Sequence, residues 1–97
     1  MKISEFQKKI EDLYYRKDSA RGVHGTFAWF VEEVGELSRA IRKGERTNMD
    51  EEFADVLAWL STLASLTGID LEKAAVSKYG ESCPRCRKSP CACKEKL

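Results

Sequence analysis

The sequence predicts an all-α fold: a four-helix module followed by a short Cys-rich C-terminal tail. Apolar residues recur at helical spacing along most of the chain. Capping residues and glycines fall where these periodic segments begin and end. No segment alternates strictly between apolar and polar residues, as a half-buried strand would. We therefore expect a helical domain over residues 1–80 and a tail over 81–97.

The first predicted helix covers residues 5–17. Ser4 followed by Gln7 forms a capping-box pattern before it. Its apolar residues are four, at i, i+4, i+7 and i+8: Phe6, Ile10, Leu13 and Tyr14. The segment 18–25, DSARGVHG, breaks this period and holds two glycines, so it predicts a loop.

Three further helices are expected after this loop. The second begins at Thr26 and ends at Gly44, because glycine is common just past a helix end. Asn48 with Glu51 three residues later predicts the start of the third, which ends before Gly68. The fourth is capped by Asp70, runs through Tyr79 and stops at Gly80.

Length and charge limit the classes of function. A chain of 97 residues buries only about 60–65 % of its unfolded surface, so apolar helix faces are expected to pack against another subunit. A net charge of +1, from 17 basic and 16 acidic residues, argues against a protein that coats nucleic acid or an anionic membrane. No apolar run is long enough for a membrane span, and the N-terminus lacks an apolar signal core, so we expect a cytoplasmic protein.

Two pairs of acidic residues are the most informative feature. Glu33 and Glu36 lie three apart on the second predicted helix, and Glu52 and Asp55 lie three apart on the third. This spacing places each pair on one helical face, where it can bind one cation. Glu52 falls within the apolar arc of its helix, and a carboxylate facing a core costs several kcal/mol unless it is neutralised. Oxygen ligands without His or Cys favour Mg²⁺ or Mn²⁺ over zinc.

Either pair alone would more simply be a solvated helix surface, since glutamate is a good helix former. The two pairs together, partly at core-facing positions, favour a metal site. Glu32 is adjacent but points elsewhere, so a surface role, a supporting role and a role in activating water all stay open.

The segments FAWFVEEVGELSRAIRKG and DEEFADVLAWLSTLASLTGIDLEKAAVSKYG carry an E-E-x-x-E and an E-x-x-D pattern. In this respect the sequence resembles the MazG family of nucleotide pyrophosphohydrolases, within the all-α nucleoside triphosphate pyrophosphatase superfamily. The resemblance covers residues 4–80. It implies an all-α helical bundle completed by dimerisation or tetramerisation, in which Glu33, Glu36, Glu52 and Asp55 hold Mg²⁺. It also implies cleavage of nucleoside triphosphates (NTP or dNTP) to a nucleoside monophosphate and pyrophosphate, as house-cleaning of the nucleotide pool.

Substrate contacts are expected from basic and aromatic residues near these carboxylates. Arg39, Lys43 and Lys78 are candidates for binding the phosphates. Trp29 shares the helical face of the first acidic pair and can stack on a base, whereas Trp59 is expected in the core.

The cysteines are confined to eleven residues near the C-terminus: Cys83, Cys86, Cys91 and Cys93. They are too clustered to staple a fold by disulfides, and four thiolates suit a tetrahedral structural Zn²⁺ site. A redox-active thiol cluster and an unstructured tail are the alternatives.

Two other functions are compatible with the sequence. One is an oligomeric helical binding module whose zinc-pinned basic tail contacts nucleic acid or protein, although no aromatics are interleaved for base stacking. The other is hydrolysis of phosphoribosyl-ATP within the same superfamily. The base and sugar preference of the pocket cannot be predicted from the spacing of the carboxylates.

Overall fold

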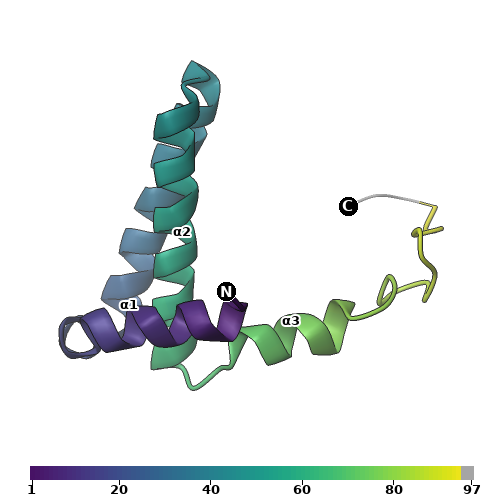
Figure 1. Cartoon of the computed structure of the whole chain (residues 1–97), viewed down its shortest axis with the longest axis horizontal. Helices are drawn as coiled ribbons and strands as arrows, with labels where there is room; N and C mark the ends of the chain where they lie inside the picture. The colour runs from purple at the N-terminus through teal and green to yellow at the C-terminus, as the bar shows by residue number, and fades with distance from the viewer. Residues whose placement is uncertain (95–97) are drawn as a thin grey trace.

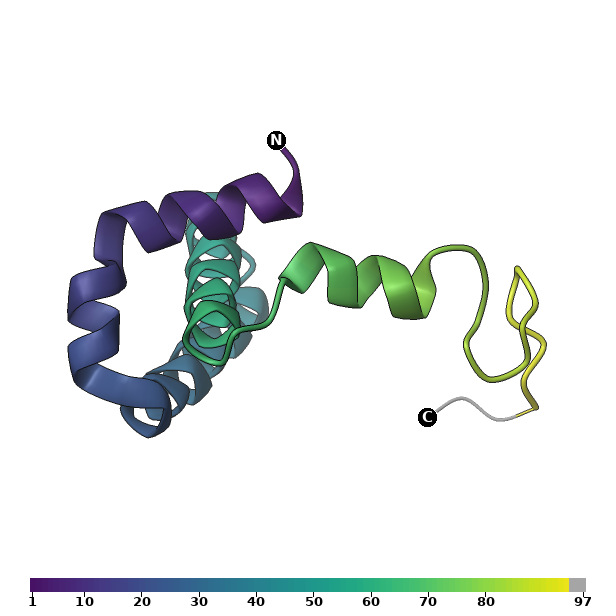
Figure 2. The same cartoon turned by 90° about the horizontal axis from the view of Figure 1, so that it is seen from below.

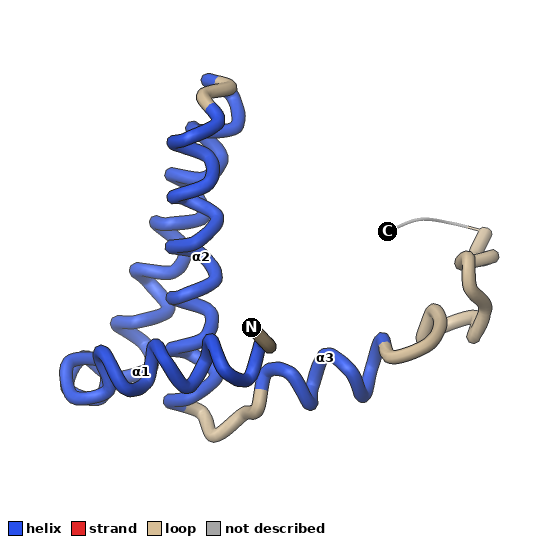
Figure 3. The backbone as a smooth tube through the Cα atoms, in the orientation of Figure 1, coloured by secondary structure: helices blue, strands red, loops and turns tan. Residues whose placement is uncertain are grey.

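The computed structural model describes residues 1–94, so the last three residues of the predicted tail lie outside the described range. Three α-helices make up the described chain: α1 (Ile3–Lys43), α2 (Arg46–Leu66) and α3 (Leu71–Tyr79). Residues 1–94 contain no strand (Figure 3). The all-α prediction is confirmed, but the number of helices is three and not four.

The bend in α1 sets the shape of the molecule. At Gly22 the backbone has φ 85° and ψ 171°, a conformation that glycine adopts without strain. The first part of α1 crosses the lower end of α2, and the second part runs antiparallel beside α2 up to the turn at Gly44 (Figure 1). From the lower end of α2 the chain turns into α3, which points away from the α1–α2 pair and leads to the tail (Figure 2).

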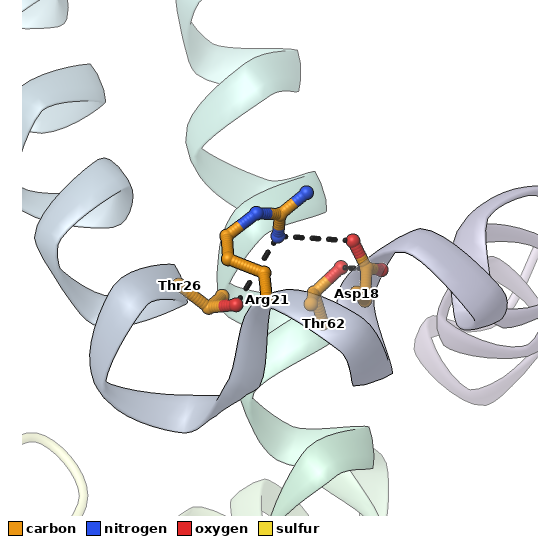
Figure 4. A network of polar contacts seen from close by, with 4 residues as sticks. All are labelled: Asp18, Arg21, Thr26 and Thr62. Atoms are coloured by element: carbon orange, nitrogen blue, oxygen red, sulfur yellow. Dashed lines mark hydrogen bonds and ion pairs between the residues drawn. The ribbon is translucent and has the colours of Figure 1, made fainter.

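The loop predicted over 18–25 is wrong, because a polar network holds this segment helical on both sides of Gly22. Asp18 is buried; its carboxylate accepts a hydrogen bond from Thr62 Oγ1 at 2.9 Å and pairs with Arg21 Nη1 at 3.1 Å. The same Arg21 nitrogen donates to Oγ1 of the buried Thr26 at 3.1 Å (Figure 4). A hydrogen bond to a charged group stabilises by about 1.5–3 kcal/mol. The network therefore ties the bend of α1 to the C-terminal part of α2.

Two predicted helix ends are confirmed. Gly44 follows α1 with φ 77°, and its N–H donates to the carbonyl of Ala40 at 3.0 Å. Asp70 caps α3 by accepting from the N–H of Lys73 at 2.9 Å. In both places the residue type matches the unusual backbone conformation or the free N–H that the helix end presents.

Two predicted helix starts are wrong. Helix α1 begins at Ile3, after an N-cap residue, Lys2, whose N–H donates to Glu5 Oε1 at 2.8 Å. Helix α2 begins at Arg46, so Asn48 lies inside the helix. Gln7, expected in a capping box, instead reaches across to the α2–α3 junction. It accepts from the N–H of Leu71 at 2.9 Å and donates to the carbonyl of Ile69 at 2.9 Å. The side chain of Gln7 therefore makes long-range hydrogen bonds in place of the local capping contact that the sequence spacing predicted.

The single chain has a very small core. The buried apolar residues among those described are Ile10, Ala40 and Ala64. Large apolar side chains are exposed along both long helices, and some of them recur at i, i+4 and i+7, which forms one stripe on each helix. These exposed residues are Phe27, Val31, Val34 and Ile41 on α1, and Phe53, Leu57 and Leu60 on α2.

None of the helices within residues 1–94 is by itself long and apolar enough to cross a membrane. Taken together, α2 and α3 reach the required length and composition, but they meet at an angle of 98°.

Candidate active site

Three glutamates from two helices come together where α1 and α2 pack against each other. Glu33 and Glu36 lie on the second part of α1, and Glu52 lies on the first part of α2. Because these parts run side by side, one carboxylate oxygen from each glutamate lies within 4.8 Å of the other two. We call these three residues the glutamate cluster. The prediction assigned four carboxylates to one metal site, and the packing of the two helices brings three of them together.

The electrostatics of the cluster are unfavourable without a counter-charge. The pKa of Glu33 is raised above its ordinary value of 4.5, first by withdrawal from water and then by the charges of Glu36 and Asp55. The pKa of Glu52 is raised by the same causes, and only Arg39 opposes the shift. Like charges at this separation favour the protonated form of each carboxyl. A cation would remove that penalty.

One atom of the cluster has no partner. Oε1 of Glu52 is buried and makes no hydrogen bond with any described residue. A buried polar atom without a partner is uncommon in folded proteins and points to a missing ion or water. The donor set consists of carboxylate oxygens, which suit Mg²⁺ or Mn²⁺. The residues present therefore fit a divalent cation of this kind.

Asp55 lies beside the glutamate cluster and not within it. Its carboxylate is outside the group of three that share a 4.8 Å radius. Its charge nevertheless raises the pKa of both Glu33 and Glu52, so it is close enough to add to their negative potential. Its role as a fourth metal ligand stays a prediction.

Two tryptophans and an arginine form a stack. In the sequence, each tryptophan is four positions from one of the acidic residues. The rings of Trp29 and Trp59 are stacked, with centroids 6.2 Å apart and planes at 20°. The guanidinium carbon of Arg21 lies 4.8 Å from the centroid of Trp59. Trp59 is half-buried, whereas Trp29 is 47 % exposed and can contact a ligand. Arg21 was missed because its segment lacks helical periodicity, and a single arginine there gives no other signal.

The three basic residues predicted to bind phosphate are in different places. Arg39 acts on Glu52 electrostatically, and Lys43 lies in the last turn of α1. Lys78 lies on α3, where its Nζ is 5.5 Å from the ring centroid of Tyr79. It lines a cavity between α3 and the tail, together with Pro84 and Arg87. In the single chain, Arg39 is thus the basic residue associated with the glutamate cluster.

The four cysteines form a second cluster. Their sulfurs all lie within 4.8 Å of one another, and none is in a disulfide. This cluster could hold a metal ion. Its soft sulfur ligands differ from the hard oxygens of the glutamate cluster, so the two clusters select different metals.

In a comparison with protein families, the model of the MazG nucleotide pyrophosphohydrolase domain matches residues 21–87. A search of curated proteins found no match. The matched segment covers more than half of the chain, and it includes the glutamate cluster, Asp55 and both tryptophans. The family typically uses a divalent metal and acts on nucleotides, which agrees with the chemistry of the cluster. The chain therefore belongs to the MazG nucleotide pyrophosphohydrolase domain family.

Proposed function

We propose that this protein hydrolyses nucleoside triphosphates between the α- and β-phosphates, giving a nucleoside monophosphate and pyrophosphate, with Mg²⁺ held by Glu33, Glu36 and Glu52. Membership of the MazG family supports the general reaction. The observation that carries the assignment of the site is the buried, unpartnered Oε1 of Glu52, because two other carboxylates lie within 4.8 Å. Asp55 is proposed as a further ligand or as a source of negative potential at the same site.

The bound cation would neutralise oxygens of the phosphate chain and so favour attack at phosphorus. The three glutamates would hold the cation between two packed helices. Arg39, whose charge acts on Glu52, is proposed to compensate charge that builds up on the leaving pyrophosphate. Glu32 lies close enough to Glu33 to raise its pKa, and it is exposed, so it can accept the proton of the attacking water.

Trp29 is proposed to contact the base. It is exposed on one side and stacked on Trp59 on the other, so its ring is already fixed before a nucleotide arrives. A rigid aromatic platform stacks on any base, which supports nucleotide binding without defining which base is preferred.

The experiment that tests this function is consumption of a nucleotide panel by purified protein, with Mg²⁺, with Mn²⁺ or with no divalent metal. The panel contains ribo- and deoxynucleoside triphosphates and phosphoribosyl-ATP. We expect turnover of at least one nucleoside triphosphate, and only with metal. If phosphoribosyl-ATP alone were hydrolysed, the protein would be a phosphoribosyl-ATP pyrophosphohydrolase and the proposed substrate class would be wrong. No turnover by folded, metal-loaded protein would contradict the enzymatic function and favour a binding module.

We also propose that the active form is a homodimer or homotetramer. The two apolar stripes on α1 and α2 support this, because a soluble monomer rarely leaves so much large apolar surface exposed on both of its main helices. Light scattering during size-exclusion chromatography measures the molar mass directly. A mass of two or four chains is expected, and a stable 11.0 kDa monomer would refute the proposal.

A further inference from the structure

The four cysteine sulfurs are arranged for a tetrahedral metal ion. The Sγ atoms of Cys83 and Cys93 are 3.8 Å apart, and those of Cys86 and Cys91 are 4.0 Å apart. A disulfide needs about 2.05 Å between sulfurs, so these pairs are not bonded. In a tetrahedral zinc site with Zn–S bonds of about 2.3 Å, geometry puts the sulfurs about 3.8 Å apart. The observed separations match the metal site.

A tight turn brings the first two cysteines together. The N–H of Arg87 donates to the carbonyl of Cys83 at 2.7 Å, and the N–H of Cys83 donates to the carbonyl of Lys88 at 3.0 Å. Arg87 has φ 65°, in the left-handed region that a residue other than glycine adopts only when the surroundings compensate. The backbone therefore closes on itself around Cys83 and Cys86.

Backbone amides also point at the sulfurs. The N–H of Ala92 donates to Cys86 Sγ at 3.3 Å, and the N–H of Cys93 donates to Cys91 Sγ at 3.3 Å. Hydrogen bonds of this kind stabilise negative charge on sulfur, which is the form that binds metal. Three basic residues lie between Cys83 and Cys91 in the sequence, and their positive charge further favours thiolates: Arg85, Arg87 and Lys88.

We propose that Cys83, Cys86, Cys91 and Cys93 bind one Zn²⁺ as a closed structural site, separate from the glutamate cluster. Four thiolates complete a tetrahedron and leave no position for water or substrate, so this zinc is structural and not catalytic. The proposal does not depend on the hydrolase function, since it rests on the geometry of the tail alone.

The described part of the tail has no apolar core to hold its conformation, and the bound zinc would do so instead. The described hydrogen bonds of residues 83–93 join residues of the tail to one another, and the tail extends away from the α1–α2 pair (Figure 2). In small segments of this kind, the free energy of metal binding contributes directly to the free energy of folding. The zinc would fix the turn that carries Pro84 and Arg87, and with it the cavity that these residues form with Lys78 of α3.

The test is elemental analysis of protein purified without chelator and under reducing conditions. We expect one zinc per chain in the unsubstituted protein and in Ser89→Ala, which changes the same loop without removing a ligand. Cys83→Ser and Cys91→Ser are each expected to hold well below one zinc while keeping the helical circular dichroism of the three helices. The readout is metal content, so loss of catalysis at the glutamate cluster would not affect it.

Replacement of zinc by Co²⁺ provides the second measurement. Tetrahedral thiolate coordination gives cobalt intense visible absorption, which is expected in the unsubstituted protein and in Ser89→Ala but not in Cys91→Ser. Bound iron in place of zinc would overturn the identity of the metal. Four freely reactive thiols in zinc-supplemented protein, with no cobalt spectrum, would overturn the site itself.

Discussion

Substitution of Glu52 by glutamine is expected to lower kcat/KM for nucleotide hydrolysis by at least about a hundredfold and to raise the stability of the metal-free protein. The loss follows because the amide contributes no negative charge to the cation site. The gain in stability follows because Glu52 carries the unpartnered buried oxygen and repels its neighbours. Stability and activity therefore change in opposite directions, as expected when a residue is kept for function and not for folding.

Glu51→Gln is the matched control for this variant. It makes the same chemical change one residue earlier on α2, at an exposed position outside the glutamate cluster. Steady-state kinetics and chemical unfolding of both variants give the comparison. Equal turnover by the two variants would show that Glu52 does not act in the reaction, and a destabilised Glu52→Gln would show that its carboxylate serves the fold.

Magnesium is expected to stabilise the protein, and to do so more at neutral pH than near pH 5. In the metal-free protein the folded-state pKa values of Glu33 and Glu52 lie above the ordinary 4.5, so the folded state holds protons more tightly than the unfolded state. Stability should therefore fall as the pH rises from 4.5 through these raised values. Mg²⁺ binds the ionised cluster and reverses that loss, by about 2.7 kcal/mol at roughly a hundred times its Kd.

Unfolding curves with and without Mg²⁺ at the two pH values provide the measurement. Adding Mg²⁺ without prior chelation leaves any zinc in the tail undisturbed, so the shift reports on the carboxylates. Glu52→Gln should show a smaller shift at neutral pH. A shift of the same size at both pH values, or one retained in full by Glu52→Gln, would mean that Mg²⁺ binds elsewhere.

The parts of the site that the sequence predicted are those set by local spacing. Glu33 and Glu36 share a helical face because they are three residues apart, and Gly44 and Asp70 mark helix ends through their own backbone chemistry. Residues within one turn of each other are neighbours in any helix, so no tertiary information is needed. The four cysteines are close in space for the same reason: they are close in sequence.

The parts that it could not predict depend on contacts between distant segments. Residues 18–25 look like a loop, yet Asp18 is held by Thr62, 44 positions away. Gln7 does not cap the first helix, because its side chain accepts a hydrogen bond from the N–H of Leu71. Joining Glu52 to the two glutamates of α1 likewise requires the two helices to pack in one register. The periodicity of a sequence shows which residues share a helix face, but it does not show which other helix packs against that face.

The identity of the products tests the central claim most directly. Phosphorus NMR of a nucleoside triphosphate incubated with the protein and Mg²⁺ distinguishes the two bonds that hydrolysis can break. Cleavage between the α- and β-phosphates predicts a nucleoside monophosphate and pyrophosphate in equal amounts, with no diphosphate accumulating. A nucleoside diphosphate with orthophosphate would contradict the account, because the enzyme would then break the bond between the β- and γ-phosphates.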